Sequence, residues 1–178
     1  EIPDFTGVLE AFQTLRAVLF ATMMEPIMQQ HRDKIAPEII GNIERGLNIT
    51  PPQIFEAERI RIELFKKILD FFETHDFLIC PAASIAPFPV DQRYVTEIDG
   101  KPCETYIDWF SITFALTMTA CPTISVPCGF TSEGLPVGIQ IMGKPRGEAA
   151  LLLVAKRFEQ AIGISAKLPI TPQKLKLI

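Results

Sequence analysis

Residues 119 to 143 read TACPTISVPCGFTSEGLPVGIQIMG, and Glu133 is the only charged side chain among them. Two apolar stretches rich in β-branched residues flank the tetrapeptide Thr-Ser-Glu-Gly, whose residues favour turns. This pattern predicts a β-hairpin with strands near residues 123–130 and 136–142. Because a segment with so few charges is stable only when it is covered, it needs an apolar partner, either in this chain or in another part of a longer protein.

The composition of the chain predicts a well-packed globular protein. The sequence has 178 residues, 48% of them hydrophobic, and a formal net charge of -4 with both signs scattered along it. This length suits one sizeable core better than two complete domains. Since no basic stripe or polybasic tract occurs, nucleic acid and anionic membrane surfaces are poor candidates for partners. The uncharged stretch 109–132 contains Pro122, Pro127 and Gly129, which favours buried core over a membrane span.

Neither a disulfide framework nor a metal site is expected. The four cysteines are dispersed without C-x-x-C spacing, which favours free thiols in a reducing cytoplasm: Cys80, Cys103, Cys121 and Cys128. His31 and His75 stand far apart and have no neighbouring ligand at helical spacing, so we expect no metal or other cofactor. The sequence starts at Glu1 without a methionine, which permits a chain that begins within a longer protein.

The first 75 residues are expected to be helical. From Thr6 to His31, apolar residues recur every three to four positions, which predicts an amphipathic helix ending near Pro26. Residues 32–49 are expected to form only a short helix with loops, because three helix breakers interrupt them: Pro37, Gly41 and Gly46.

The clearest helix is predicted at residues 50–74. Thr50 and Gln53 form a T-x-x-Q capping box at its start. Its apolar residues make two adjacent stripes that together exceed one buried face, so we expect cover on two sides. The stripes are Ala57, Ile60, Leu64, Ile68 and Phe71, and Ile62, Phe65, Leu69 and Phe72.

The charges of this helix predict two local ion pairs. Glu63 and Lys67 have the favourable i,i+4 spacing. Glu58 and Arg61 intrude into the apolar arc. They pair with each other or with a polar partner elsewhere, or Arg61 extends its guanidinium group into water.

The second half of the chain alternates strands, loops and helices. Residues 76–81 (DFLICP) predict a buried strand, and the long loop 82–103 contains an Asp99-Gly100 turn. Loops of this length commonly line a site. Helices are predicted at 104–118 and at 148–161, the latter closed by Gly163, and residues 164–178 form a tail.

Three sequence motifs of catalytic sites are absent or fail on inspection. Residues 138–145 (GIQIMGKP) match the spacing of a phosphate loop, but a strand-like apolar segment and Pro145 replace the exposed glycine-rich loop and the metal-binding hydroxyl. No G-x-S-x-G or S-x-x-K motif occurs. Cys80 and Cys128 lack a neighbouring base and are interpreted as structural.

Three stretches in order resemble the C-terminal portion of the amidase-signature family of hydrolases. They are FFETHDFLICPAAS, YIDWFSITFALTMTACP and PTISVPCGFTSEGLPVGIQIMGKPRGEAALLLVAKRFEQA. The resemblance is strong over residues 51–163 and implies an α/β fold, the C-terminal part of an amidase-signature fold with a mixed β-sheet flanked by helices. Residues 1–178 are accordingly expected to form a single C-terminal segment of an amidase-signature domain. Thr117 and Ala120 depart from the family, which often has Asn and Gly there.

The resemblance also implies what this segment lacks. Family members cleave amides with a nucleophilic Ser, a bridging Ser and a Lys base beside a glycine- and serine-rich segment. No such segment occurs here, and the serines stand alone, so we expect no catalytic residue in this chain and an inactive isolated polypeptide. The serines are Ser84, Ser111, Ser125, Ser132 and Ser165.

Three functions remain open. The first is an amidase segment that supplies core and substrate-pocket walls, with Asp108, Trp109 and the loop 81–103 as walls for a small amide; core packing is an equal alternative for Trp109. The second is a non-catalytic interaction module. The third is the A-type subunit of an amidotransferase. The expected partners are a missing N-terminal catalytic half or a partner subunit, and a second copy of the chain is a further candidate.

Overall fold

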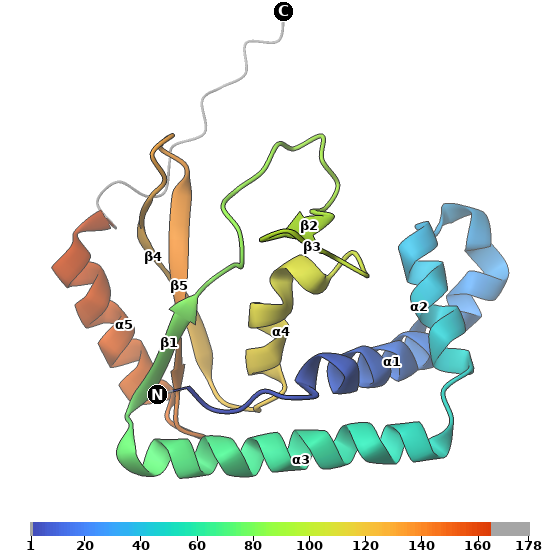
Figure 1. The fold of residues 1–178 in the computed structure, drawn as a ribbon, viewed down its shortest axis with the longest axis horizontal. Helices are drawn as coiled ribbons and strands as arrows, with labels where there is room; N and C mark the ends of the chain where they lie inside the picture. Colours follow the sequence, from blue (N-terminus) through green and yellow to red (C-terminus); the bar gives the residue numbers. More distant parts are fainter. Residues whose placement is uncertain (1, 165–178) are drawn as a thin grey trace, which may run out of the picture. The chain divides into compact units, whose positions relative to one another are not determined.

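The computed structural model describes residues 2–164, which form two compact units (Figure 1). The first unit comprises the chain up to His75 together with Tyr94–Ala120, and the second comprises Asp76–Arg93 together with the chain from Cys121 onward. Almost all of the predicted tail, including Ser165, lies outside the described residues.

The first unit begins with helix α1, Val8–His31. The helix is where the sequence predicts it, but the expected end near Pro26 is wrong, because the helix continues through this proline for another turn. A proline in a helix leaves the carbonyl four residues earlier without its donor. Here that residue is Thr22, and both Thr22 and Pro26 are exposed, so water can satisfy the carbonyl.

A short 3₁₀ turn η1, Arg32–Lys34, leads to helix α2, Pro37–Leu47. The prediction that three residues break this region is wrong. Pro37 occupies the first turn, where no amide donor is needed, and Gly41 and Gly46 lie within the helix. Gly46 faces α1 so closely that a Cβ atom there would lie 2.0 Å from the carbonyl oxygen of Ala17. The glycine therefore permits a close approach of two helices.

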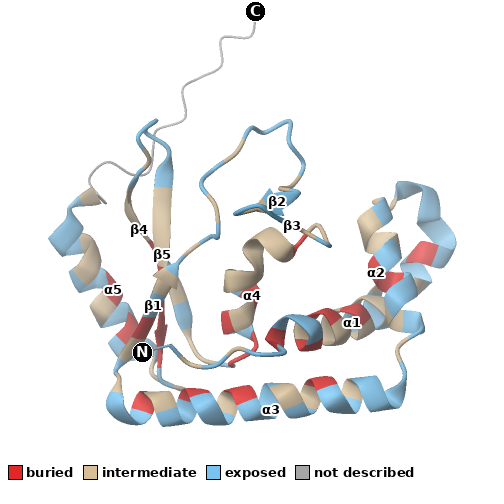
Figure 2. Cartoon of the chain, in the orientation of Figure 1, coloured by how far each residue is buried: buried red, intermediate tan, exposed pale blue. Residues whose placement is uncertain are grey.

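Helix α3, Pro51–Thr74, starts with the predicted capping box. The backbone amide of Thr50 donates to Oε1 of Gln53 at 2.8 Å. Its first apolar stripe is largely covered, with Ala57, Leu64 and Ile68 buried. Cover on the second side is incomplete among the described residues, since Ile62 and Leu69 are 52% and 41% exposed; exposed positions recur along α3 in Figure 2.

The ion pairs of α3 follow the sequence only in part. Arg61 pairs with Glu58 at 2.6 Å, as predicted. The predicted pair of Glu63 with Lys67 is wrong: Glu63 pairs with Lys66 at 2.7 Å, and Lys67 reaches Asp4 of the N-terminal segment at 2.6 Å. This contact and hydrogen bonds from Thr6 hold the pKa of the exposed Asp4 carboxyl below its usual range.

The rest of the first unit contains a small hairpin and a helix. Strands β2, Glu97–Ile98, and β3, Lys101–Pro102, are antiparallel and joined by the predicted Asp99-Gly100 turn, in which both residues have positive φ. The helix expected at 104–118 begins later: a 3₁₀ turn η2, Asp108–Phe110, precedes helix α4, Ser111–Thr117.

The second unit contains the segment with almost no charge. Strands β4, Thr123–Phe130, and β5, Pro136–Gly143, form the predicted hairpin, and β1, Phe77–Pro81, pairs with the other edge of β5. The described sheet therefore has the order β1-β5-β4, with every pair antiparallel. At the turn, the amide of Thr131 donates to the carbonyl of Leu135 at 2.8 Å, and Gly134 has a φ of 82°.

Helix α5, Glu148–Ile162, covers one face of this sheet (Figure 1). Leu151 and Ala155 of the helix pack in one buried cluster with Val126 of β4 and Ile141 of β5. Gly163 ends the helix in the left-handed conformation, as predicted. The apolar partner of one face of the hairpin is thus this helix, and the α/β fold class is confirmed.

Three further expectations concern the whole of the described chain. Within residues 2–164 no helix is both long and apolar enough to cross a membrane. The four cysteines are free thiols. No group of three potential metal ligands occurs in this part of the chain.

Candidate functional site

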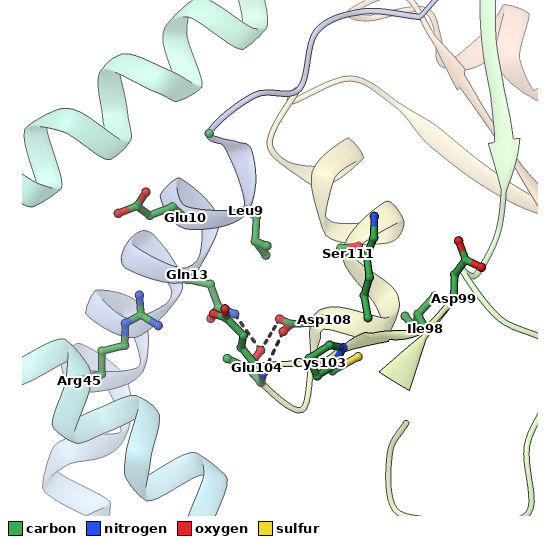
Figure 3. Close-up of a pocket in the computed structure, with 14 residues that line it drawn as sticks. Leu9, Glu10, Gln13, Arg45, Ile98, Asp99, Cys103, Glu104, Asp108 and Ser111 are labelled. Atoms are coloured by element: carbon green, nitrogen blue, oxygen red, sulfur yellow. Dashed lines mark hydrogen bonds between the residues drawn. The ribbon is translucent and has the colours of Figure 1, made fainter. Parts of the chain in front are cut away.

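The first unit contains a pocket of about 840 Å³ that is open to solvent (Figure 3). Helix α1 forms one wall, Arg45 of α2 adds to it, and the β2–β3 hairpin and the segment from Cys103 to Ser111 form the rest. The lining residues are Gly7, Leu9, Glu10, Gln13, Arg45, Ile98, Asp99, Lys101, Pro102, Cys103, Glu104, Thr105, Asp108 and Ser111.

Asp108 is half-buried and lines this pocket. Its carboxylate accepts two hydrogen bonds from Thr105, one from the backbone amide at 2.8 Å and a very short one from the hydroxyl. These bonds close the turn from Thr105 to Asp108, which leads into η2. Both carboxylate oxygens thus already have one partner, and each keeps a lone pair for another donor.

Trp109 lies next in the chain but is not among the residues that line the pocket. Its half-buried ring packs edge-on against Phe110, with centroids 5.1 Å apart. From the predicted wall loop 81–103, the residues around the hairpin reach the pocket, whereas the segment before Tyr94 belongs to the second unit. The structure therefore brings Asp108 together with the end of this loop.

Gln13 of α1 is a pocket residue that sequence reasoning missed. Its side chain is 7% exposed, and its Nε2 donates to the hydroxyl of Thr105 at 3.1 Å. A signal was available, because Gln13 is an uncharged polar residue between Ala11 and Ala17, which are buried on the same helix.

A second polar network, also missed, holds the same segment from the side of α2. Arg16 donates to Oδ1 of Asn42 at 2.7 Å and to the hydroxyl of Tyr106, and Asn42 donates to that hydroxyl at 3.0 Å. The guanidinium also lies over the rings of Phe20 and Tyr106, at 4.4 and 5.5 Å from their centroids. These contacts fix residues 103–111 against α1 and α2.

The pocket contains no activated nucleophile. Ser111 and Lys101 both line it, but within the described residues no hydrogen bond joins the hydroxyl to the amine, so the lysine does not act as its base. Cys103 lines the pocket without a neighbouring histidine. In the second unit, burial raises the pKa of the Cys80 thiol, which keeps it protonated and weakly nucleophilic.

Comparison with known proteins gives consistent matches. The sequence model of the amidase family matches residues 6–152. The A-type subunit of a glutamyl-tRNA(Gln) amidotransferase from Alkaliphilus metalliredigens (strain QYMF) is 26% identical over 166 residues, which are 86% of this chain and 31% of that protein. An acylamidase of Rhodococcus erythropolis is 29% identical over 132 residues, 74% of this chain and 28% of that protein.

Solved structures show the same fold. The crystal structure of a bacterial aryl acylamidase of the amidase-signature family superposes with a TM-score of 0.77 at 22% identity, over 94% of this chain and 37% of that one. The chain thus spans less than a third of the length of the two relatives named above.

Proposed function

Because the chain belongs to the amidase family, we propose that it is the pocket-forming part of an enzyme that cleaves a carboxamide C–N bond. In this proposal the nucleophile and its base come from residues beyond these 178, and the pocket of the first unit holds the substrate. The observation that carries the proposal is the match of the family model to residues 6–152, which include every residue that lines the pocket.

The chemistry of the described residues supports this division of roles. An amide is cleaved when an activated hydroxyl attacks its carbonyl carbon and donors stabilise the oxygen. Neither Ser111 nor Cys103 has a base in contact, so the pocket can bind and orient a substrate but cannot attack it. Half-burial of Asp108 and its fixed geometry suit it to accept a hydrogen bond from the substrate, and Trp109 is proposed to form an adjoining apolar wall.

Two alternatives remain as outcomes of the test. An A-type amidotransferase subunit would use the same hydrolysis of a carboxamide to deliver ammonia to a partner. The similarity to the amidotransferase subunit of Alkaliphilus supports this alternative. A non-catalytic interaction module would bind without turnover. The free cysteines support a reducing compartment such as the cytoplasm for all three.

The deciding experiment starts from the polypeptide that carries this sequence in its native source. Its intact mass is measured, and hydrolysis of aryl amides, aliphatic amides and glutamine is followed with and without the proteins that copurify. We expect a mass well above 19.9 kDa and release of ammonia or amine from at least one amide class. Turnover of glutamine only with a copurifying partner would identify the amidotransferase version of the function.

A native mass near 19.9 kDa together with no turnover of any amide would contradict the proposed function and leave the interaction module. Within an active enzyme, Asp108→Asn should raise KM for the amide, since it weakens the acceptor that faces the pocket.

A further inference from the structure

Gln13 is the most deeply buried polar side chain in the wall of the pocket. It lies on α1, is 7% exposed, and extends toward Asp108 (Figure 3), with its Nε2 bonded to the hydroxyl of Thr105. A buried amide is costly unless both of its ends are satisfied. The question is therefore which end of Gln13 the protein satisfies.

The hydrogen-bond chain fixes the orientation of the amide. The single hydroxyl proton of Thr105 goes to Oδ1 of Asp108, because an ionised carboxylate can only accept. The Thr105 oxygen is then an acceptor toward Gln13, so the group that faces it must be the amide nitrogen, at 3.1 Å. The oxygen and the nitrogen of the Gln13 amide are nearly identical in shape, so their positions are assigned from their hydrogen-bond partners.

The other end of the amide, Oε1, accepts no hydrogen bond from the residues that the structure describes. Within residues 2–164, the hydrogen bond of the Gln13 side chain is the one that Nε2 donates to Thr105. No fully buried side-chain oxygen or nitrogen in the described chain lacks a partner, so Oε1 retains access to solvent, which the adjoining pocket provides. The pocket thus contains an oriented acceptor without a protein donor.

The charges around the pocket favour the same kind of ligand. Four carboxylates line it against two cations, the latter being Arg45 and Lys101. Among the described residues neither cation, nor any of the carboxylates of Glu10, Asp99 and Glu104, takes part in an ion pair. Excess negative charge attracts a cation and repels an anion, whereas a neutral ligand is not repelled.

We propose that Gln13 is a substrate-recognition residue whose Oε1 accepts a hydrogen bond from an N–H group of the ligand, so that the pocket takes a primary amide or a protonated amine and excludes a carboxylate. This inference names the substrate class of the pocket and rests on the proposed function. Its test measures binding without turnover, so that the two proposals can fail separately.

The test uses three small probes of similar size on the 178-residue chain at pH 7. Propionamide and propylammonium present N–H donors, whereas propionate presents only acceptors. Binding is followed by NMR, with the side-chain amide of Gln13 and the backbone amides of residues 103–111 as reporters. We expect saturable shifts with the first two probes and none with propionate at the same concentrations.

Two variants separate recognition from structural support. Gln13→Met and Gln13→Glu both lose the donor to Thr105, but only Gln13→Glu keeps an acceptor toward the pocket. We expect Gln13→Met to weaken binding of propylammonium by about fivefold or more, the range for loss of one hydrogen bond. Gln13→Glu should bind propylammonium at least as tightly as the unchanged chain, because its acceptor is charged.

Equal losses in the two variants would contradict the proposal, since they would reveal a purely structural role for Gln13. Unchanged binding in Gln13→Met would do so as well. If neither variant folds, as judged by circular dichroism, the probe series on the unchanged chain still decides: propionate that binds as well as propionamide, or shifts that avoid the pocket, would overturn the inference.

Discussion

Two segments pack against helix α1 by different means. Helix α2 approaches with its backbone in close contact at Gly46, which leaves no room for even one added carbon beside Ala17, and Asn42 adds one hydrogen bond from Arg16. The pocket segment 103–111 combines the buried side chain of Ile107 with polar contacts, which run from Gln13 to Thr105 and from Arg16 to Tyr106. The two neighbours of one helix thus depend on different physical properties of their residues.

The contact at Gly46 is limited by steric fit, whereas the hydrogen-bonded contacts of the pocket segment tolerate a change of one group. Close backbone packing is stable only while one residue stays small, and it carries no chemical group that a ligand could use. The hydrogen-bonded segment loses less when one group changes, and it exposes acceptors to the pocket. A site that must change its ligand without losing its fold is better built on the second kind of contact.

The largest effect is expected from Gly46→Ala. The added Cβ would lie 2.0 Å from the Ala17 oxygen and 2.7 Å from the Ala21 Cβ, which forces α2 away from α1. We expect the free energy of unfolding to fall by about 3 kcal/mol, the upper end for overpacking. Fluorescence of Trp109, the single tryptophan, reports unfolding of this unit.

Gly41→Ala is the matched control in the same helix. Nothing lies within 4 Å of a Cβ at this position, so the change should stabilise the helix by about 0.5 to 1 kcal/mol through backbone entropy. If both variants changed the stability in the same direction and by similar amounts, close packing at Gly46 could not be what distinguishes α2 from the pocket segment.

An intermediate effect is expected from Tyr106→Phe, which tests the polar contact. The variant keeps the ring beneath Arg16 but removes the acceptor that serves both Arg16 and Asn42. We expect a loss of about 1 to 2 kcal/mol in the free energy of unfolding, as for one buried hydrogen-bonded group. Tyr106→Leu, which also removes the ring, should lose more, and urea denaturation measures both variants. A loss near zero in Tyr106→Phe together with a large loss in Tyr106→Leu would contradict the prediction, because it would assign the contact to the ring alone.

Elements with a strong period were predictable from sequence. The hairpin of β4 and β5 and helix α5 match their predicted bounds closely, because alternation, turn residues and Gly163 all favour the same structure there. The capping box at Thr50 fixed the start of α3 in the same way. Local chemistry and tertiary structure agree in these regions.

The polar contacts of the pocket were not predictable in the same way. Asp108 could be chosen as a site residue from its motif, but its bonds to Thr105 depend on a turn whose start no periodicity marks. Gln13 and Tyr106 lie more than ninety positions apart, and only tertiary structure brings the helix and the segment together. A helix breaker such as Gly46 was misinterpreted because its role is to fit a neighbour, which the local sequence does not contain.

The smallest effect concerns Ala120, which follows α4 at the end of the 94–120 part of the first unit. Ala120 stands where the amidase-signature family often has glycine, and the structure gives it a φ of 55°, in the left-handed region. An alanine in this conformation costs about 1 to 2 kcal/mol of stability. A glycine avoids that cost, but its greater freedom in the unfolded chain offsets part of the gain. Ala120→Gly should therefore stabilise the first unit by about 0.5 to 1 kcal/mol in thermal unfolding.

Ala115→Gly within α4 is the control, since the same change in a right-handed helix should destabilise by a similar amount. If Ala120→Gly raises the free energy of unfolding and Ala115→Gly lowers it, the strain lies in the backbone at Ala120, where removing the methyl group relieves it. A destabilised Ala120→Gly would instead mean that the methyl group packs usefully, and then this position would resemble the sterically fitted Gly46 contact more than the hydrogen-bonded pocket wall.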